Sequence, residues 1–265
     1  MPIEKNLEFQ KRKIFYRIIG EGPAVMLLHG LPFDGNLWER QLDSLSGFKF
    51  IVPDLPGSGA SAMVDDMSME GMTEVIKTIL DSEQIGLVTL IGHSMGGYIS
   101  LAFAEKYPER LKGMGLFHST AFPDNEERKA NRKKGIEFIE KNGAHEFLKT
   151  IIPNLFSPRS RDNLANFIDE LIGKTNNFSP QSLVSYYKAM MQRPDRTNVL
   201  KLLKVPMLFI AGKYDGAAPL NDLLRLCHLP EISYFHILAE SGHLGMLEES
   251  EKSNSILNDY LIKLS

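Results

Sequence analysis

Three side chains of the sequence offer the chemistry of acyl transfer: Ser94, Asp215 and His243. A serine hydroxyl is a poor nucleophile until a base removes its proton, and an imidazole can be that base because it titrates near neutral pH. A carboxylate completes such a group by orienting the imidazole and stabilising its protonated form. We therefore interpret Ser94 as a candidate nucleophile, His243 as its general base and Asp215 as the acid behind the base.

The candidate nucleophile lies in the segment GHSMG at residues 92–96, which matches the pattern G-x-S-x-G. The pattern alone is a weak signal, because chance produces it in roughly one chain in ten of this composition. Its surroundings strengthen it: an apolar run at 87–91 predicts a strand directly before it, and a helix is expected to start near Gly96. A sharp strand–turn–helix connection would expose Ser94 Oγ and direct the N–H group of Met95 toward a developing oxyanion.

The base and the acid each have competitors in the sequence. His243 follows the last apolar run in a glycine-flanked loop, which favours it over the other histidines. Asp215 follows the run before that one, where its carboxylate could reach the His243 ring and fix its tautomer. Asp124 is the alternative acid, since it comes just after the preceding predicted strand. Asp54 is expected instead to stabilise a turn through hydrogen bonds to backbone N–H groups.

Other histidines lie close to the predicted strand ends. His93 is expected to pack below the serine turn. His29 and His118 each end a predicted strand and are interpreted as possible pocket-lining residues; His29 should also shape the loop that follows it, and a core position is the alternative for His118. We expect no metal and no cofactor, because no group of His, Cys, Asp and Glu has ligand spacing and no phosphate-binding loop occurs.

Short apolar runs alternate with helix-length amphipathic stretches through most of the chain. Such alternation predicts a parallel sheet with helices on both faces, since strands buried on both sides read as continuous apolar runs. Residues 7–19 fit an antiparallel edge strand or hairpin instead. The apolar runs lie at 25–28, 50–52, 87–91, 114–117, 207–210 and 234–238, and helices are expected near 37–45, 69–81, 96–107, 219–228 and 250–263.

The alternation stops between residues 121 and 197, where the sequence is polar, helix-prone and poor in strand signals. A bare loop of that length is uncommon in a compact domain. We interpret 121–197 as a helical cap inserted into a core made of residues 1–120 and 198–265. The cap should roof the site and admit small or slender substrates, whereas most of its apolar residues are expected to form its own core.

Composition and charge are those of an ordinary globular protein with one large domain: 265 residues, 43% hydrophobic and 24% charged. A net charge of −3 gives no reason to expect nucleic acid or an anionic membrane as a partner. No apolar segment reaches the about 20 residues of a transmembrane helix, and no signal-peptide core follows the N-terminus. The single cysteine, Cys227, fits a cytoplasmic protein. The oligomeric state is left undetermined.

Further segments resemble the motifs of the α/β-hydrolase superfamily, in its branch with a helical cap, and the resemblance covers nearly the whole chain. It implies a mostly parallel sheet of about eight strands with flanking helices, and an oxyanion hole formed by the backbone N–H groups of Met95 and Leu31. Ser250 departs from the pattern, because many members have proline there. The matching segments are His29-Gly30, the turn DLPGSGAS at 54–61, the acid turn GKYDGAAP at 212–219, the loop Ser241-Gly242-His243, and Glu248.

The expected activity is that of a carboxylesterase-like serine hydrolase, which cleaves small-molecule esters through an acyl-Ser94 intermediate. The residues leave other reactions of the same triad open: hydrolysis of thioesters, lactones or C–C bonds, perhydrolysis, and a lyase reaction. A protein of another class also stays open, a hydrolase-fold receptor that binds a small ligand and turns it over slowly. Repeated turnover separates the two classes, since a receptor should stall after a single cycle.

Overall fold

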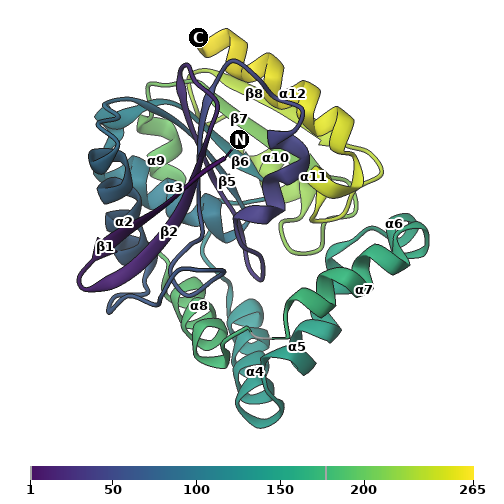
Figure 1. Cartoon of the computed structure of the whole chain (residues 1–265). Helices are drawn as coiled ribbons and strands as arrows, with labels where there is room; N and C mark the ends of the chain where they lie inside the picture. Colours follow the sequence, from purple (N-terminus) through teal and green to yellow (C-terminus); the bar gives the residue numbers. More distant parts are fainter. Residues whose placement is uncertain (1, 177) are drawn as a thin grey trace.

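The computed structural model describes residues 2–176 and 178–265, and its centre is an eight-stranded sheet (Figure 1). The strands lie in the order β1-β2-β4-β3-β5-β6-β7-β8. The pairings of β1 with β2 and of β2 with β4 are antiparallel, and the other five are parallel. This confirms the expected mostly parallel sheet, with the N-terminal hairpin at its edge. The strands are β1 (Ile3–Phe9), β2 (Arg12–Ile19), β3 (Ala24–Leu28), β4 (Lys49–Pro53), β5 (Val88–His93), β6 (Leu111–Phe117), β7 (Met207–Gly212) and β8 (Ser233–Leu238).

Helices occupy the connections between the strands and flank the sheet. Local chemistry sets their ends: Ser68 Oγ accepts a hydrogen bond from the Gly71 N–H group and so caps the helix that begins at Met69. None of the described helices is long and apolar enough to cross a membrane. The helices before β6 and after β7 are the 3-10 helices η1 (Gly35–Trp38) and η2 (Pro108–Arg110) and the α-helices α1 (Glu39–Leu42), α2 (Met69–Ser82), α3 (Met95–Lys106), α10 (Leu220–Leu226), α11 (Gly245–Glu248) and α12 (Ser250–Leu264).

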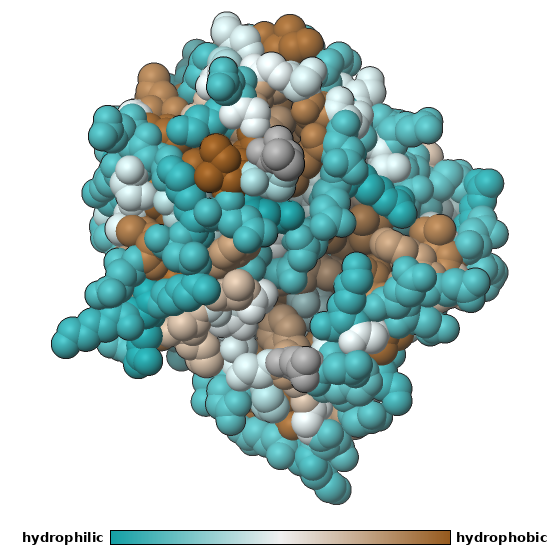
Figure 2. All heavy atoms as spheres, viewed as in Figure 1, coloured by the Kyte–Doolittle hydropathy of each residue, from teal (hydrophilic) through white to brown (hydrophobic). Residues whose placement is uncertain are grey.

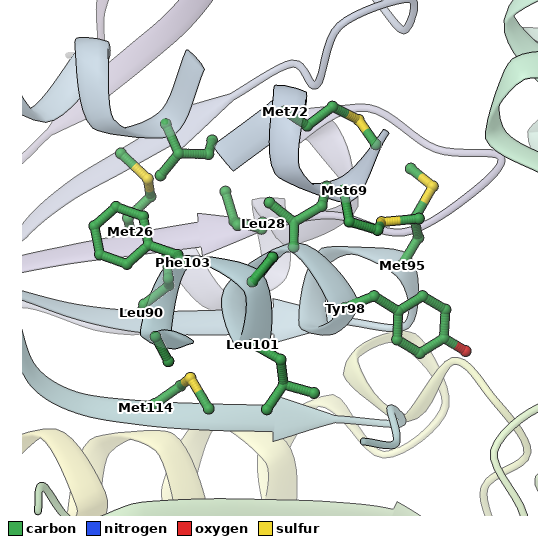
Figure 3. Close-up of a cluster of buried hydrophobic side chains, with 14 of the residues drawn as sticks. Met26, Leu28, Met69, Met72, Leu90, Met95, Tyr98, Leu101, Phe103 and Met114 are labelled. Atoms are coloured by element: carbon green, nitrogen blue, oxygen red, sulfur yellow. The ribbon is translucent and has the colours of Figure 1, made fainter. Parts of the chain in front are cut away.

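Hydrophobic clusters cover both faces of the sheet, because successive side chains of a strand point to opposite sides. Along β3, Met26 and Leu28 belong to one cluster, whereas Val25 and Leu27 belong to the other. Figure 3 shows the first cluster, in which strand residues pack against side chains of α2 and α3. Residues of α12 complete the second cluster on the opposite face. The central strands are therefore buried on both sides, which explains their continuous apolar runs.

The chain between β6 and β7 forms six α-helices and, within the described residues, no strand. Two of these helices start with a serine cap followed by proline: Ser157 before Pro158, and Ser179 before Pro180. In Figure 1, the helices α4 to α8 lie together on one side of the core. The limits 121–197 for a separate cap stay a prediction. The helices are α4 (Glu126–Asn142), α5 (Ala144–Ile151), α6 (Pro158–Asn163), α7 (Ala165–Lys174), α8 (Pro180–Gln192) and α9 (Thr197–Leu202), with the 3-10 helix η3 (Ile152–Leu155) after α5.

Candidate active site

The turn between β5 and α3 holds Ser94 in a backbone conformation that residues other than glycine rarely adopt, with φ at 51° and ψ at −116°. The turn is tight: a Cβ atom at Gly96 would lie 2.4 Å from the carbonyl oxygen of Leu28. The Ser119 hydroxyl, two residues after the end of β6, donates a hydrogen bond of 2.8 Å to the Ser94 carbonyl and supports the turn. The segment GHSMG thus forms a sharp strand–turn–helix connection with a half-buried Ser94 at its tip.

Two backbone N–H groups near Ser94, those of Met95 and Leu31, have no hydrogen-bond partner among the described residues. Met95 is the first residue of α3, where N–H groups lack helical partners and the helix dipole favours negative charge. Leu31 follows Gly30, and a Cβ atom at Gly30 would lie 2.7 Å from Ser94 Cβ. Both N–H groups therefore remain candidate donors to an oxyanion formed on a group bound at Ser94.

The loop after β3 is held by His29, whose side chain is fully buried. Its Nδ1 lies 3.1 Å from the Gly30 carbonyl oxygen, and its Nε2 lies 2.9 Å from the Leu55 backbone nitrogen. Since the Leu55 N–H group can only donate, Nε2 is the acceptor and Nδ1 carries the proton. His29 was expected as a possible pocket-lining residue; instead both of its ring nitrogens are used inside the protein, where they shape the loop that carries Leu31.

The candidate acid and base form a buried pair. His243 Nδ1 lies 2.8 Å from Oδ2 and 3.0 Å from Oδ1 of Asp215. Asp215 Oδ1 also accepts hydrogen bonds of 2.8 Å from the N–H groups of Ala217 and Ala218. Burial by itself raises the pKa of Asp215, but the charge of His243 and the hydrogen bonds from His118 and His243 outweigh it and hold that pKa well below its usual range. Asp215 is thus a fixed anion at neutral pH.

The His243 loop is anchored next to the serine turn. The Nε2–H group of His93 donates a hydrogen bond of 2.9 Å to the His243 carbonyl, and the His243 N–H group donates one of 2.6 Å to the Leu155 carbonyl in η3. Burial, followed by the charges of His243 and His118, keeps the pKa of His93 well below its usual value, so His93 is a neutral support. Within the described residues no hydrogen bond joins Ser94 Oγ to His243; such bonds are often long in unliganded sites and tighten when substrate binds.

His118, expected as a pocket-lining or core residue, is fully buried and bonded to the acid. Its Nδ1 lies 3.0 Å from Asp215 Oδ2, and its Nε2 accepts a hydrogen bond of 3.1 Å from the Gly245 N–H group. Ligand-type atoms of His118, Asp215 and His243 lie within 4.8 Å of one another. Sequence spacing does not reveal this convergence, and both imidazoles already spend a nitrogen on the Asp215 carboxylate. The available signal was that His118 directly follows β6, the sheet neighbour of the strand before Asp215.

The alternative acids have other partners. Asp124 forms ion pairs with Arg193 at 2.9 Å and with Arg132 at 2.5 Å. The carboxylate of Asp54 accepts hydrogen bonds from the Gly35 and Ala60 N–H groups, as expected for a residue that stabilises a turn. Of the three aspartates considered, Asp215 is the one that hydrogen-bonds to His243.

Glu248 connects the His243 loop to the chain between β6 and β7. Its Oε1 accepts hydrogen bonds from the N–H groups of Gly242 at 2.9 Å and Leu244 at 3.1 Å. Its Oε2 accepts one of 2.8 Å from the Ser157 N–H group at the start of α6. One carboxylate therefore holds both sides of His243 and fixes them against the start of α6, a role that the sequence motif alone did not reveal.

A pocket of about 260 Å³ lies where the loop after β3 meets α7. It begins one residue after Leu31, and Ser94 and His243 are not among its lining residues. Figure 2 shows apolar surface between the helices α4 to α8 and the sheet region, framed by hydrophilic side chains. The charged residues of the pocket are two acids and two bases, Asp34, Glu39, Arg40 and Lys174. Its apolar residues are Pro32, Phe33, Leu37, Phe167, Leu171, Phe178 and Leu247.

Comparison with known proteins identifies relatives along nearly the whole chain. The family model described as alpha/beta hydrolase fold matches residues 23–134. The 2-hydroxy-6-oxononadienedioate/2-hydroxy-6-oxononatrienedioate hydrolase of Paraburkholderia phymatum is 28% identical, over 94% of this chain and 91% of its own. The 2-hydroxy-6-oxo-6-phenylhexa-2,4-dienoate hydrolase of Comamonas testosteroni is 26% identical, with the same coverage of 94% and 91%.

Solved structures give the same picture. A thermophilic esterase from Thermogutta terrifontis is 28% identical and superposes with a TM-score of 0.89, covering 100% of this chain and 99% of the esterase. The enol-lactonase from Burkholderia xenovorans also has a TM-score of 0.89, with 97% of this chain and 100% of the lactonase covered. At 21% identity the second likeness is one of fold. The fold and the relatives together indicate a hydrolase, whereas the bond that is cleaved differs among them.

Proposed function

Because the chain belongs to the α/β-hydrolase superfamily, we propose that it is a serine hydrolase that cleaves small carboxylic esters. Ser94 would be the nucleophile, His243 its general base and Asp215 the acid that orients the base. The observation that carries the proposal is the buried His243–Asp215 pair, joined at 2.8 Å, beside a serine in a strained turn with φ at 51°. Strained backbone and a buried anion are features that cluster at catalytic sites.

The proposed reaction is acyl transfer to water in two steps. Ser94 Oγ attacks the ester carbonyl while His243 Nε2 takes the hydroxyl proton, and the N–H groups of Met95 and Leu31 stabilise the negative oxygen. His243 then gives the proton to the leaving alcohol, which leaves an acyl-Ser94 ester. A water molecule, deprotonated by the same imidazole, hydrolyses that ester and regenerates the hydroxyl.

The charge of the neighbouring pocket supports a neutral ester as substrate. Its four charged residues cancel in sign, and Arg40 is also bonded to the Leu247 carbonyl at 2.6 Å and stacked on the Phe167 ring at 5.0 Å. Apolar residues make up most of the remaining wall. A slender, neutral acyl or alcohol group could be buried there, because it carries no charge whose hydration would be lost. Since the pocket starts beside the candidate donor Leu31, we propose that it receives one arm of the substrate.

C–C bond hydrolysis is the second candidate. Relatives named for such substrates match 94% of this chain at 26–28% identity. The substrate in the first of those names is a dioate, which carries two carboxylates. A pocket for a dianion should have a net positive charge, and the balanced charges of this pocket favour the ester.

A substrate panel tests the proposal. Purified protein would be incubated with p-nitrophenyl acetate, butyrate and octanoate and with a 2-hydroxy-6-oxo-dienoate, with the Ser94→Ala variant as the matched control. Repeated turnover of at least one ester that is lost in the variant supports the proposal. Faster turnover of the dienoate would assign the C–C reaction instead, and release of one equivalent of p-nitrophenol followed by a halt would assign a slow receptor.

The expected partners and location follow the same proposal. A small-molecule substrate fits the volume of the pocket, about 260 Å³. The net charge of −3 still gives no reason to expect nucleic acid as a partner. A cytoplasmic location, expected from the single cysteine, stays a prediction that fractionation of cells would test.

A further inference from the structure

We propose that His118 is a positioning residue of this site, whose imidazole fixes the Asp215 carboxylate and ties it to the loop that carries His243. The inference rests on the proposed function, in which Asp215 orients His243. It starts from two hydrogen bonds of one buried ring: Nδ1 to Asp215 Oδ2 at 3.0 Å, and Nε2 to the Gly245 nitrogen at 3.1 Å. Gly245 lies two residues after His243, so the ring bridges the acid turn and the base loop.

The proton of His118 can be assigned from its partners. The Gly245 N–H group can only donate, so His118 Nε2 is an unprotonated acceptor. A neutral ring then carries its proton on Nδ1, which donates it to Asp215. Burial lowers the pKa of His118. It outweighs the hydrogen bond to Asp215 and the charge of that carboxylate, which act in the opposite direction. A neutral ring is the form that satisfies both partners, because protonated Nε2 would face the Gly245 N–H group.

The surrounding backbone makes room for this ring on both elements that it connects. A Cβ atom at Gly245 would lie 2.6 Å from His118 Nε2, and one at Gly212 would lie 2.8 Å from its Cε1. His118 itself has φ at 50°, a backbone conformation that is uncommon for residues other than glycine. Its N–H group donates a hydrogen bond of 2.8 Å to the Ile210 carbonyl, which continues the β6–β7 ladder. Close packing and a strained backbone favour a specific role over simple filling of space.

The hydrogen bond from His118 should tune the base as well as hold the acid. Asp215 Oδ2 is shared by two imidazoles, so part of its negative charge is spent on His118 rather than on His243. The other titratable groups that face this cluster are His93 and Glu248. Without the His118 donor, Asp215 would stabilise the protonated form of His243 more strongly. The carboxylate would also be free to rotate, and the orientation of His243 would be less well defined.

The test compares His118→Phe with His118→Gln in the intact protein, with His236→Phe as a control for losing a histidine elsewhere in the sheet. Phenylalanine fills the space but lacks both polar atoms, whereas the glutamine amide can donate to Asp215 and accept from Gly245. We expect His118→Phe to lower kcat about 10–100-fold with little change in KM. The acid limb of its kcat/KM profile should move up by about 0.5 pH unit or more. His118→Gln should recover most of kcat, and His236→Phe should match the wild type.

A His118→Phe variant with wild-type kcat and pH profile would overturn the proposal, since the ring would then only fill space. A wild-type measurement decides the matter even if the variant does not fold: long-range ¹H–¹⁵N NMR of the histidine rings should show His118 as the Nδ1–H tautomer. The Nε2–H tautomer would contradict the assignment. Failure of the underlying function is distinguishable, because it would appear as Ser94→Ala activity equal to wild type, whatever the tautomer of His118.

Discussion

Replacing Asp215 by asparagine keeps the shape of the side chain and removes its charge, so it tests the acid directly. The carboxylate accepts hydrogen bonds from two backbone N–H groups through Oδ1 and from two imidazoles through Oδ2. An amide has one acceptor oxygen, so its NH₂ group must face either the Ala217 and Ala218 N–H groups or the two rings. Opposed donors in a buried site reduce the free energy of unfolding by about 1–3 kcal/mol.

The effect on catalysis should be much larger than the effect on stability. If the amide oxygen stays with the backbone, His118 cannot change tautomer without losing its bond to Gly245. His243 can change, and its proton then moves to Nε2, the nitrogen that accepts the proton of Ser94 in the proposed reaction. We therefore expect kcat to fall about 10³–10⁴-fold, the size of effect known for a wrong tautomer in such triads.

The assay is the steady-state rate on the best p-nitrophenyl ester, together with urea unfolding of the same preparation. Asp124→Asn is the matched control, because Asp124 is also buried and paired but its partners are Arg132 and Arg193. It should retain kcat within about tenfold. A nearly normal Asp215→Asn beside a crippled Asp124→Asn would refute the reasoning and move the acid to the chain after β6.

Two further predictions concern stability and the His243 loop. The free energy of unfolding should fall as the pH drops from about 6.5. Burial lowers the pKa of His29, His93 and His118 below the value in the unfolded chain, so below this pH the unfolded chain binds protons that the folded chain does not. Each histidine lowers the free energy of unfolding by at most about 1.4 kcal/mol per pH unit. Urea titrations at pH 7.5, 6.5 and 5.5 measure this, and a pH-independent midpoint would contradict it. Glu248→Gln should reduce both kcat and the free energy of unfolding, the latter by about 1–3 kcal/mol, since its NH₂ group must face one of three backbone donors. Substitution of the exposed Glu251 by glutamine is its control, and equal rates in the two variants would show that the Glu248 hydrogen bonds have no part in catalysis.

The presence of the central strands could be predicted, because a continuous apolar run indicates a strand that is buried on both faces. The residues at which the strands begin and end could not be predicted in this way. The run at 87–91 predicts a strand that stops before Gly92, whereas β5 continues to His93, which pairs with Phe117. Similarly, β6 begins at Leu111, three residues before the run at 114–117. Lys112 and Gly113 interrupt the apolar run, but the strand pairing to β5 continues across them with a register shift: Leu111 pairs with Val88, and Gly113 pairs with Thr89. Backbone pairing depends on the neighbouring strand, which local hydropathy does not describe.

The candidate site also has a part that could be predicted from the sequence and a part that could not. The serine turn is local, and its short spacing of glycines and its position after a strand could be interpreted directly. The contact between His118 and Asp215 joins residues 97 positions apart and depends on β6 lying beside β7 in the sheet. Once that order is known, side chains at the carboxyl ends of neighbouring parallel strands are expected to meet. The hydrogen bond between Glu248 and the Ser157 N–H group forms because η3 and α6 pass beside the His243 loop. No sequence pattern indicated that path of the chain.

Covalent labelling of Ser94 tests the central claim most directly, because it reports an activated nucleophile without assuming a substrate. The wild type would be treated with a serine-directed fluorophosphonate and examined by intact-mass and peptide mass spectrometry, beside Ser94→Ala and Asp215→Asn. The account predicts a single adduct on the peptide that contains Ser94, much slower labelling in Asp215→Asn, and none in Ser94→Ala. An adduct that persists in Ser94→Ala, or a folded wild type that stays unlabelled, would contradict it.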